Sequence, residues 1–175
     1  MAVLESGQTS GFAGSVTERL EAEICELSGH IAAATARLVL MIAEYDSRRG
    51  WAEWGCRSAA HWLSWKCGVG VHAAREKLRV GHALGALPLL RTAFERGEVS
   101  YSQVRAVTRV AGPHNEAAFV GIAKASTANQ LERLVAATAR AEKIWDQGFA
   151  AAQLSEGGVL NSLCEVSRRI WRTLL

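Results

Sequence analysis

The chain of 175 residues has only two prolines, and aromatic residues make up only 7% of it. Strands favour β-branched and aromatic residues, and their turns favour glycine and proline, so this composition argues against a β-sandwich or a barrel. Alanine, the strongest helix former, occurs 30 times. Apolar residues make up 49% and charged residues 21%, which is typical of a globular domain. We therefore expect an all-α, multi-helix bundle.

The sequence also lacks a long apolar run. Residues 1–15 show neither the basic start nor the apolar core of a secretory signal. The longest nearly apolar stretch, at 31–43, is interrupted by Arg37 and is shorter than the roughly 20 residues of a membrane-spanning helix. Without an export signal, the four cysteines are expected to be reduced thiols. We therefore expect a cytoplasmic protein that makes no membrane contact.

Signatures of catalysis are absent as well. The sequence contains no glycine-rich phosphate loop after a strand, no G-x-S-x-G motif and no carboxylate pair tied to a site. Cys56, His61, Cys67 and His72 have the side chains that zinc prefers, but their C-x4-H-x5-C-x4-H spacing does not match a zinc finger or ribbon. We expect no enzyme activity, no metal, no cofactor and no small-molecule ligand.

Helix boundaries are marked by capping residues, glycine and proline. The expected N-terminal caps are Ser15, Ser58, Ser100 and Thr127. Pro88 and Pro113 suit the first position of a helix, and Gly97 ends one. The pattern predicts seven helices, at residues 15–48, 58–67, 71–86, 88–96, 100–111, 113–124 and 127–143.

These helices are expected to form one domain at residues 15–145. Residues 1–14 are rich in glycine and serine and are expected to be a mobile tail. From about Trp145 the apolar pattern degrades. We expect residues 146–175 to be a divergent tail with at most one short helix, near 160–174.

The first expected helix carries the strongest periodic signal. Apolar residues at spacings of three and four form a seam over nearly four heptads. The seam consists of Leu20, Ile24, Leu27, Ile31, Ala34, Leu38, Met41 and Tyr45. Such a seam is either the spine of the bundle or a stripe for self-association. We expect the spine, because the alanines beside the seam favour close packing of neighbouring helices.

Charge is distributed unevenly along the chain. Residues 1–56 carry a net charge of −4, residues 57–109 carry +6 and residues 110–175 carry +1. The middle segment has nine Lys/Arg against three Asp/Glu. The middle segment is therefore the place to look for an anionic partner, although the charge by itself favours basic residues that only solvate helix faces.

Within this segment, residues 58–86 are expected to form a helix-turn-helix-like hairpin with its turn at Gly68–Gly70. Leu63 and Val69 are expected inside it, against Ala74 and Leu78. Four residues of its second helix fall within roughly 60° of one another at about 100° per residue, and two arginines of a later helix extend the surface. The six expected contacts with double-stranded DNA are His72, Arg75, Arg79, His82, Arg105 and Arg109. The alternative is a solvated stripe, diluted by Glu76.

Four tryptophans lie within fifteen residues, and they allow two interpretations. They are Trp51, Trp54, Trp62 and Trp65. Base stacking on exposed indoles is one interpretation. A core beneath the hairpin is the one that we expect, because indoles bury much apolar area.

Several motifs resemble the mycobacterial 13E12-repeat family. They are Gly50–Gly68 (GWAEWGCRSAAHWLSWKCG), Ala73–Glu76, Leu87-Pro88, Gly97–Ala106 (GEVSYSQVRA) and Thr127–Val135 (TANQLERLV). The resemblance covers roughly residues 17–143, and beyond about Lys143 the chain departs from the family pattern, which continues as a charged helix.

The resemblance implies an actinobacterial helical domain of unknown function that often precedes an HNH endonuclease domain and is tied to mobile elements. This chain stops before such a nuclease could begin, so the resemblance implies a partial copy without it, and no catalytic residue can be carried over. We expect a non-enzymatic, DNA-associated module. The alternative is a protein-interaction or oligomerisation domain that associates through residues 20–45 and binds no nucleic acid.

Overall fold

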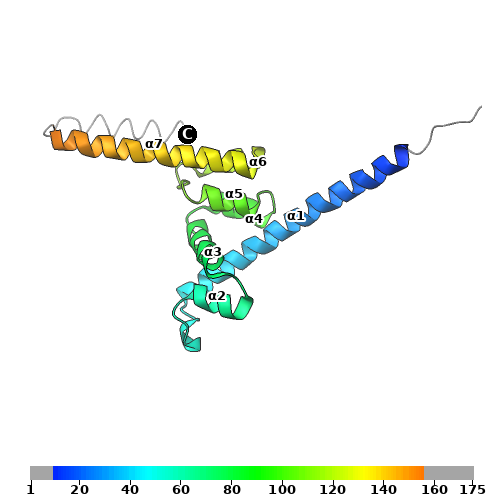
Figure 1. Cartoon of the computed structure of the whole chain (residues 1–175), viewed down its shortest axis with the longest axis horizontal. Coiled ribbons are helices and arrows are strands. Elements are labelled where there is room, and N and C mark those ends of the chain that lie inside the picture. The colour runs from blue at the N-terminus through cyan, green and yellow to red at the C-terminus, as the bar shows by residue number, and fades with distance from the viewer. Residues whose placement is uncertain (1–9, 156–175) are drawn as a thin grey trace, which may run out of the picture.

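The computed structural model describes the backbone of residues 10–155, which contain seven α-helices and no strand (Figure 1). The helices are α1 Ser10–Ser47, α2 Ala59–Cys67, α3 Val71–Leu84, α4 Pro88–Glu95, α5 Tyr101–Val107, α6 Glu116–Ala125 and α7 Ala128–Ser155. A short 3₁₀ helix, η1 at Ala52–Trp54, lies between α1 and α2. The all-α prediction, with a long N-terminal helix, is confirmed.

Helix α3 lies at the centre of the molecule, in contact with α1, α2, α4 and α5. The long helices α1 and α7 extend away from this centre in different directions (Figure 1). A large core cluster joins α1 and α3 to α4–α7, with Phe94, Leu84 and Leu90 fully buried in it. A smaller cluster around Leu63 and Ala74 joins α2 to α1 and α3, as predicted for the inside of the hairpin.

Three of the four predicted caps are confirmed. The Ser58 hydroxyl accepts a hydrogen bond from the His61 N–H at 3.2 Å at the start of α2. Ser100 and Gln103 form a reciprocal capping box at α5, and Thr127 and Gln130 form another at α7. Each pair satisfies backbone N–H groups that have no partner within the helix.

Several boundaries differ from the prediction. Helix α1 already begins at Ser10, so the capping pattern at Ser15 lies within a helix. Helix α5 ends at Val107, and α7 continues past Lys143 to Ser155. Before α6 the Asn115 side chain accepts a hydrogen bond from the Gly112 N–H at 2.7 Å. Pro113 lies in this turn and not in the helix, so α6 begins three residues later than predicted. The expected helix near 160–174 lies outside the described residues.

The position of the α1 seam is the largest correction. The helix buries a different face, made of the small or β-branched residues Ala32, Ala36, Val39, Ile42 and Ala43. Six residues of the predicted spine are 44–59% exposed, namely Leu20, Ile24, Leu27, Ile31, Leu38 and Met41. We call these six the apolar stripe. The alanines beside the seam, rather than the seam itself, pack against the body.

Two glycines explain this choice of face. A Cβ atom on Gly81 of α3 would lie 2.6 Å from the Val39 carbonyl oxygen, so α1 and α3 meet at a distance that only glycine allows. Gly97, at φ 72°, touches the backbone of Gly29 in the same way. Every residue from 16 to 28 is exposed. We call this part of α1, which projects beyond the Gly29 contact, the N-terminal arm.

Candidate functional site

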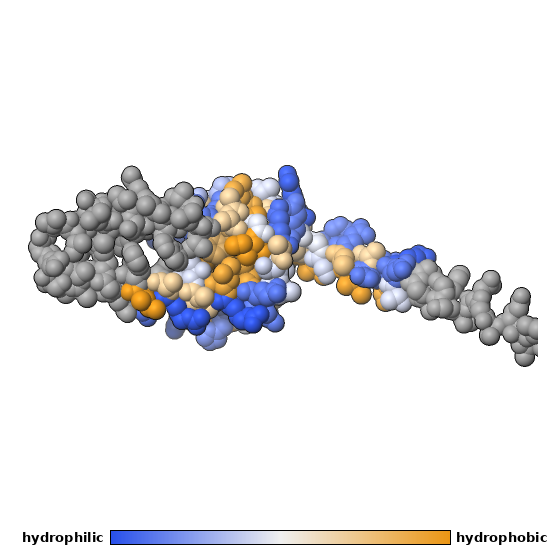
Figure 2. Space-filling model, turned by 90° about the horizontal axis from the view of Figure 1, so that it is seen from above, coloured by the Kyte–Doolittle hydropathy of each residue, from blue (hydrophilic) through white to orange (hydrophobic). Residues whose placement is uncertain are grey.

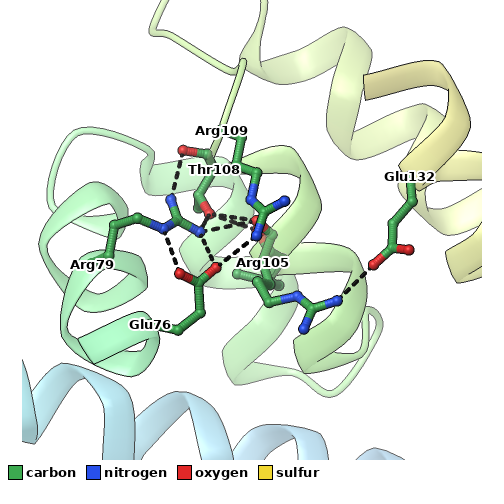
Figure 3. Close-up of polar contacts among 7 residues, drawn as sticks. Glu76, Arg79, Arg105, Thr108, Arg109 and Glu132 are labelled. Carbon is green, nitrogen blue, oxygen red and sulfur yellow. Dashed lines mark hydrogen bonds and ion pairs between the residues drawn. The ribbon is translucent and has the colours of Figure 1, made fainter. Parts of the chain in front are cut away.

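The Glu76 carboxylate pairs with two of the arginines that were predicted to face DNA (Figure 3). Arg79 donates to both Glu76 carboxylate oxygens, at 2.9 and 3.1 Å, and Arg109 donates to one of them at 3.2 Å. The Arg79 guanidinium also donates to the backbone oxygens of Thr108 and Arg105, at 3.2 and 3.1 Å. Arg79 therefore ties α3 to the C-terminal end of α5, where helix carbonyl groups have no partner within the helix.

The pKa of Glu76 reflects this arrangement. The pKa is lowered from 4.5 to about 2, chiefly by the hydrogen bond from Arg79; burial opposes this shift, and Arg109 adds to it. A carboxylate held by two guanidinium groups stays ionised at any physiological pH. Glu76 and its two arginines thus form an ion cluster with a net charge of +1, in which the carboxylate offsets one of the two guanidinium charges at this surface.

Two further predicted contacts also have acidic partners. Arg105 pairs with Glu132 of α7 at 2.6 Å (Figure 3), and His82 pairs with Asp46 of α1 at 2.9 Å. The second Asp46 oxygen accepts a hydrogen bond from the Trp51 indole N–H at 3.1 Å. The first pair connects α5 to α7, and the second connects α3 to α1. Both pairs therefore hold helices together, which is a structural role.

His72 and Arg75 are the two predicted contacts that remain exposed and form no ion pair within the described part of the chain. The six residues therefore do not form one free basic face. The spacing of Glu76 and Arg79 in the sequence could have predicted their ion pair, because residues three apart on a helix meet on its surface. DNA contact by these residues stays a prediction.

The tryptophans divide into two kinds. Trp62 is half-buried, with its ring centroid 4.5 Å from that of Tyr45, and Trp51 is half-buried as well. Trp54 and Trp65, in contrast, are 55% and 57% exposed, which corrects the expected core position for these two. Sequence reasoning could not see this difference, because all four have similar spacing and flanking residues.

The zinc pattern is not brought together as a site. Cys56 is buried, while His61, Cys67 and His72 are exposed. Within the described residues, no three His, Cys, Asp or Glu side chains gather as metal ligands would.

The buried carboxylate of Glu116 accepts a hydrogen bond from the Leu90 N–H at 2.8 Å, so it satisfies an N–H group in the first turn of α4.

The apolar stripe of α1 is the most extended exposed apolar feature of the described chain. Apolar side chains lie among hydrophilic ones along the projecting part of this helix (Figure 2). Where the stripe reaches the body, a groove of about 580 Å³ lies between α1 and α4. Met41 and Leu40 line it with Arg91 and Glu95 of α4.

By length and composition alone, α1 over Val16–Ser47 is apolar enough to cross a membrane, which differs from the expectation drawn from run length. A mostly buried core helix of a soluble protein and a signal sequence near the N-terminus pass the same test, and 17% of the apolar window is buried here. The C-terminal half of α1 packs against α3 and α4, and five of its residues are buried there. This half therefore already has protein, rather than lipid, on one face.

The chain matches a known protein family over most of its length. The family profile of DUF222, described as a domain of unknown function, matches residues 21–162, which is most of the chain. The match extends beyond Lys143, where the family pattern was expected to end. Neither the curated proteins nor the solved structures contain a match. The 13E12-repeat family is DUF222. The chain therefore belongs to the DUF222 family, a helical domain whose function is unknown.

Proposed function

We propose that this chain is a non-enzymatic association domain that forms a homodimer through the apolar stripe of α1. The observation that carries the proposal is the exposure of six large apolar side chains, 44–59% each, on one helical face. Exposed contiguous apolar surface of this kind marks interaction sites, because water contact with it is unfavourable.

The spacing of the stripe fits a second copy of the same helix. In heptad terms, Ile24, Ile31 and Leu38 occupy a positions, and Leu20, Leu27, Ala34 and Met41 occupy d positions. Isoleucine at a with leucine at d favours a parallel, two-stranded coiled coil. A parallel pair also places both bodies at the same end, so the two exposed arms meet along their whole length.

The flanking residues are compatible with this pairing. In a parallel pair each g position faces the following e position of the partner. Glu23 then faces Ser28, and His30 faces Thr35. No two like charges meet at these positions, so the flanks of the stripe do not oppose the dimer.

The expected stability of the dimer follows from the exposed area. Fully burying one such side chain gains about 1.5–3 kcal/mol. With about half of each side chain still to be buried, the twelve side chains of two stripes gain on the order of 10 kcal/mol. Association costs about 4–15 kcal/mol. At the low end of this cost the net gain is about 6 kcal/mol, so we expect a weak, reversible dimer with a Kd on the order of tens of micromolar.

Sedimentation of the purified chain and of two variants tests the proposal. Leu27→Asp places a charge in the middle of the stripe and should give a monomer with unchanged helix content. Leu89→Asp is the matched control, because Leu89 is 51% exposed on α4, away from the stripe. A wild-type chain that stays monomeric at about 1 mM, well above a Kd on the order of tens of micromolar, would contradict the proposal.

A cysteine variant tests the orientation. In a parallel pair the Leu20 side chains of two copies lie beside each other, whereas in an antiparallel pair each lies near the opposite end of the stripe. Leu20→Cys, with Cys25, Cys67 and Cys164 changed to Ser, should form an intermolecular disulfide on mild oxidation. Dimerisation without this disulfide would show an antiparallel pair and would leave self-association intact.

DNA association, the leading prediction from the sequence, is the second candidate function. Exposed Arg75, which has no ion pair in the described structure, favours it. Arg75→Ala should weaken duplex binding at low salt and reduce the slope of log K against log salt by about one unit. Arg91→Ala is the control, because Arg91 is exposed but pairs with Glu95. Undetectable duplex binding at low salt would remove this candidate, and duplex binding that Arg75→Ala leaves unchanged would assign the contact to other residues.

A further inference from the structure

Two exposed indoles and one lysine form a patch at the outer end of the α2 region. The Trp54 and Trp65 rings meet edge to face, with their centroids 6.1 Å apart. The Lys66 ammonium lies 4.2 Å from the Trp54 ring centroid and 4.0 Å from that of Trp65. All three residues are exposed. We call them the Trp–Lys patch.

The patch is held by two separate elements, so its shape does not depend on one flexible loop. Trp54 belongs to η1, which ends at Gly55 with φ 65°. Trp65 and Lys66 belong to the last turn of α2, which is capped by Ser58 and ends at Gly68. Rings fixed in this way lose little conformational entropy when a ligand binds.

Charge along the chain around the patch is mainly positive. Residues 54–75 contain no Asp or Glu, while Arg57, Lys66 and Arg75 are exposed cations among them. The acid that follows, Glu76, is already held by Arg79 and Arg109. Glu53, directly before Trp54, is exposed, so an anionic partner would meet three cations and one carboxylate over residues 53–75.

We propose that the Trp–Lys patch binds single-stranded nucleic acid. Unpaired bases stack on the exposed indole surfaces, and Lys66, held between the two rings, contacts the phosphate backbone together with Arg57. In a duplex the bases are already stacked on one another and their faces are closed to the indoles, so single strands are the better ligand. This inference refines the nucleic-acid candidate function and is independent of dimerisation through α1.

Fluorescence anisotropy of the full chain tests the proposal, with labelled oligothymidylate and a duplex of equal length as probes at low salt. Trp54→Ala and Trp65→Ala should each weaken oligothymidylate binding by about 5- to 150-fold, the range for loss of one stacked base. Trp54→Phe keeps a ring and should lose less. Leu89→Ala, which removes an exposed apolar side chain from α4, is the control and should change nothing.

The salt dependence tests the role of lysine separately. Lys66→Ala should reduce the salt slope of oligothymidylate binding by about 0.7 unit for one lost phosphate contact on a single strand. Oligothymidylate binding that the tryptophan variants leave unchanged would overturn the proposal. Duplex binding without single-strand binding would also overturn it, while leaving the DNA candidate standing. Binding to neither probe would end both, and a preference for anionic lipid vesicles over either probe would assign the patch to a membrane surface instead.

Discussion

The two apolar faces of α1 differ in side-chain size and in what covers them. The face that contacts α3 and α4 is made mainly of alanine and valine, and it lies against Gly81. The opposite face carries leucine, isoleucine and methionine, and nothing in the described structure covers it. Small residues let helix axes approach closely, and close approach brings many atoms into contact. The buried face of α1 is thus the one whose small side chains let the backbone of the neighbouring helix come close.

The ion pairs of the body likewise differ in how far solvent reaches them. The Glu76–Arg79 pair is partly buried and joined to α5 by three further hydrogen bonds. Arg105 and Glu132 form a single contact between more exposed side chains. An ion pair contributes more where solvent screens it less. The covered pair is therefore expected to stabilise the fold more than the exposed one.

Gly81→Ala should have the largest effect, because it breaks the covered face of α1. The new methyl group would lie 2.6 Å from the Val39 carbonyl oxygen and 2.8 Å from the Ala43 Cβ. We expect a loss of about 3 kcal/mol in the free energy of unfolding, although alanine favours the helix intrinsically. Urea denaturation followed by circular dichroism measures it.

Gly121→Ala is the matched control for this substitution. Gly121 lies in α6, and a Cβ there meets no atom within 4 Å. Helix propensity then acts alone, and the variant should be more stable by up to about 1 kcal/mol. Equal effects at the two glycines would show that α1 and α3 are not in close contact.

A pair of truncations compares the two faces of α1 directly. Val39→Ala removes two fully buried methyl groups and should cost about 2 kcal/mol. Ile31→Ala removes more atoms from a side chain that is 58% exposed, and in the monomer it should cost less than about 0.5 kcal/mol. Thermal unfolding at low protein concentration separates them. A larger loss at Ile31 would place the stripe inside the fold.

Glu76→Gln tests the covered ion cluster. Because the folded pKa of Glu76 is lowered to about 2, its ionised form stabilises the fold above pH 4.5, and this contribution is lost as pH falls towards 2. Partial exposure reduces the effect, so we expect the variant to be about 1.5 kcal/mol less stable at pH 7. The difference between wild type and variant should shrink below pH 4.5. A difference that is constant from pH 7 to pH 2 would contradict the lowered pKa.

Local signals in the sequence were sufficient for most helix boundaries. Ser58, Ser100 and Thr127 cap helices through residues three positions away, so their role can be seen without tertiary contacts. The family motifs were recognised on the same basis. The helical family domain could therefore be predicted from short stretches of chain.

Contacts between distant residues could not be predicted in this way. Periodicity shows which residues of α1 share a face, but the covered face depends on Gly81, which lies 42 positions after Val39. Likewise, the partner of Arg105 is 27 positions away on α7. A pattern of apolar or basic residues thus gives a face, and the packed structure decides whether that face is inside or outside.

Glu132→Gln should have the smallest effect of these substitutions. It removes the charge that faces Arg105 across α5 and α7, where the two side chains are 38% and 44% exposed. Exposed ion pairs contribute about 0.2–1 kcal/mol, and glutamine can still accept a hydrogen bond, so we expect a loss below about 0.5 kcal/mol that disappears at high salt. Urea denaturation at low and at high salt measures it. A loss as large as that of Glu76→Gln would mean that exposure does not separate the two ion pairs, and the distinction between covered and uncovered charges would fail.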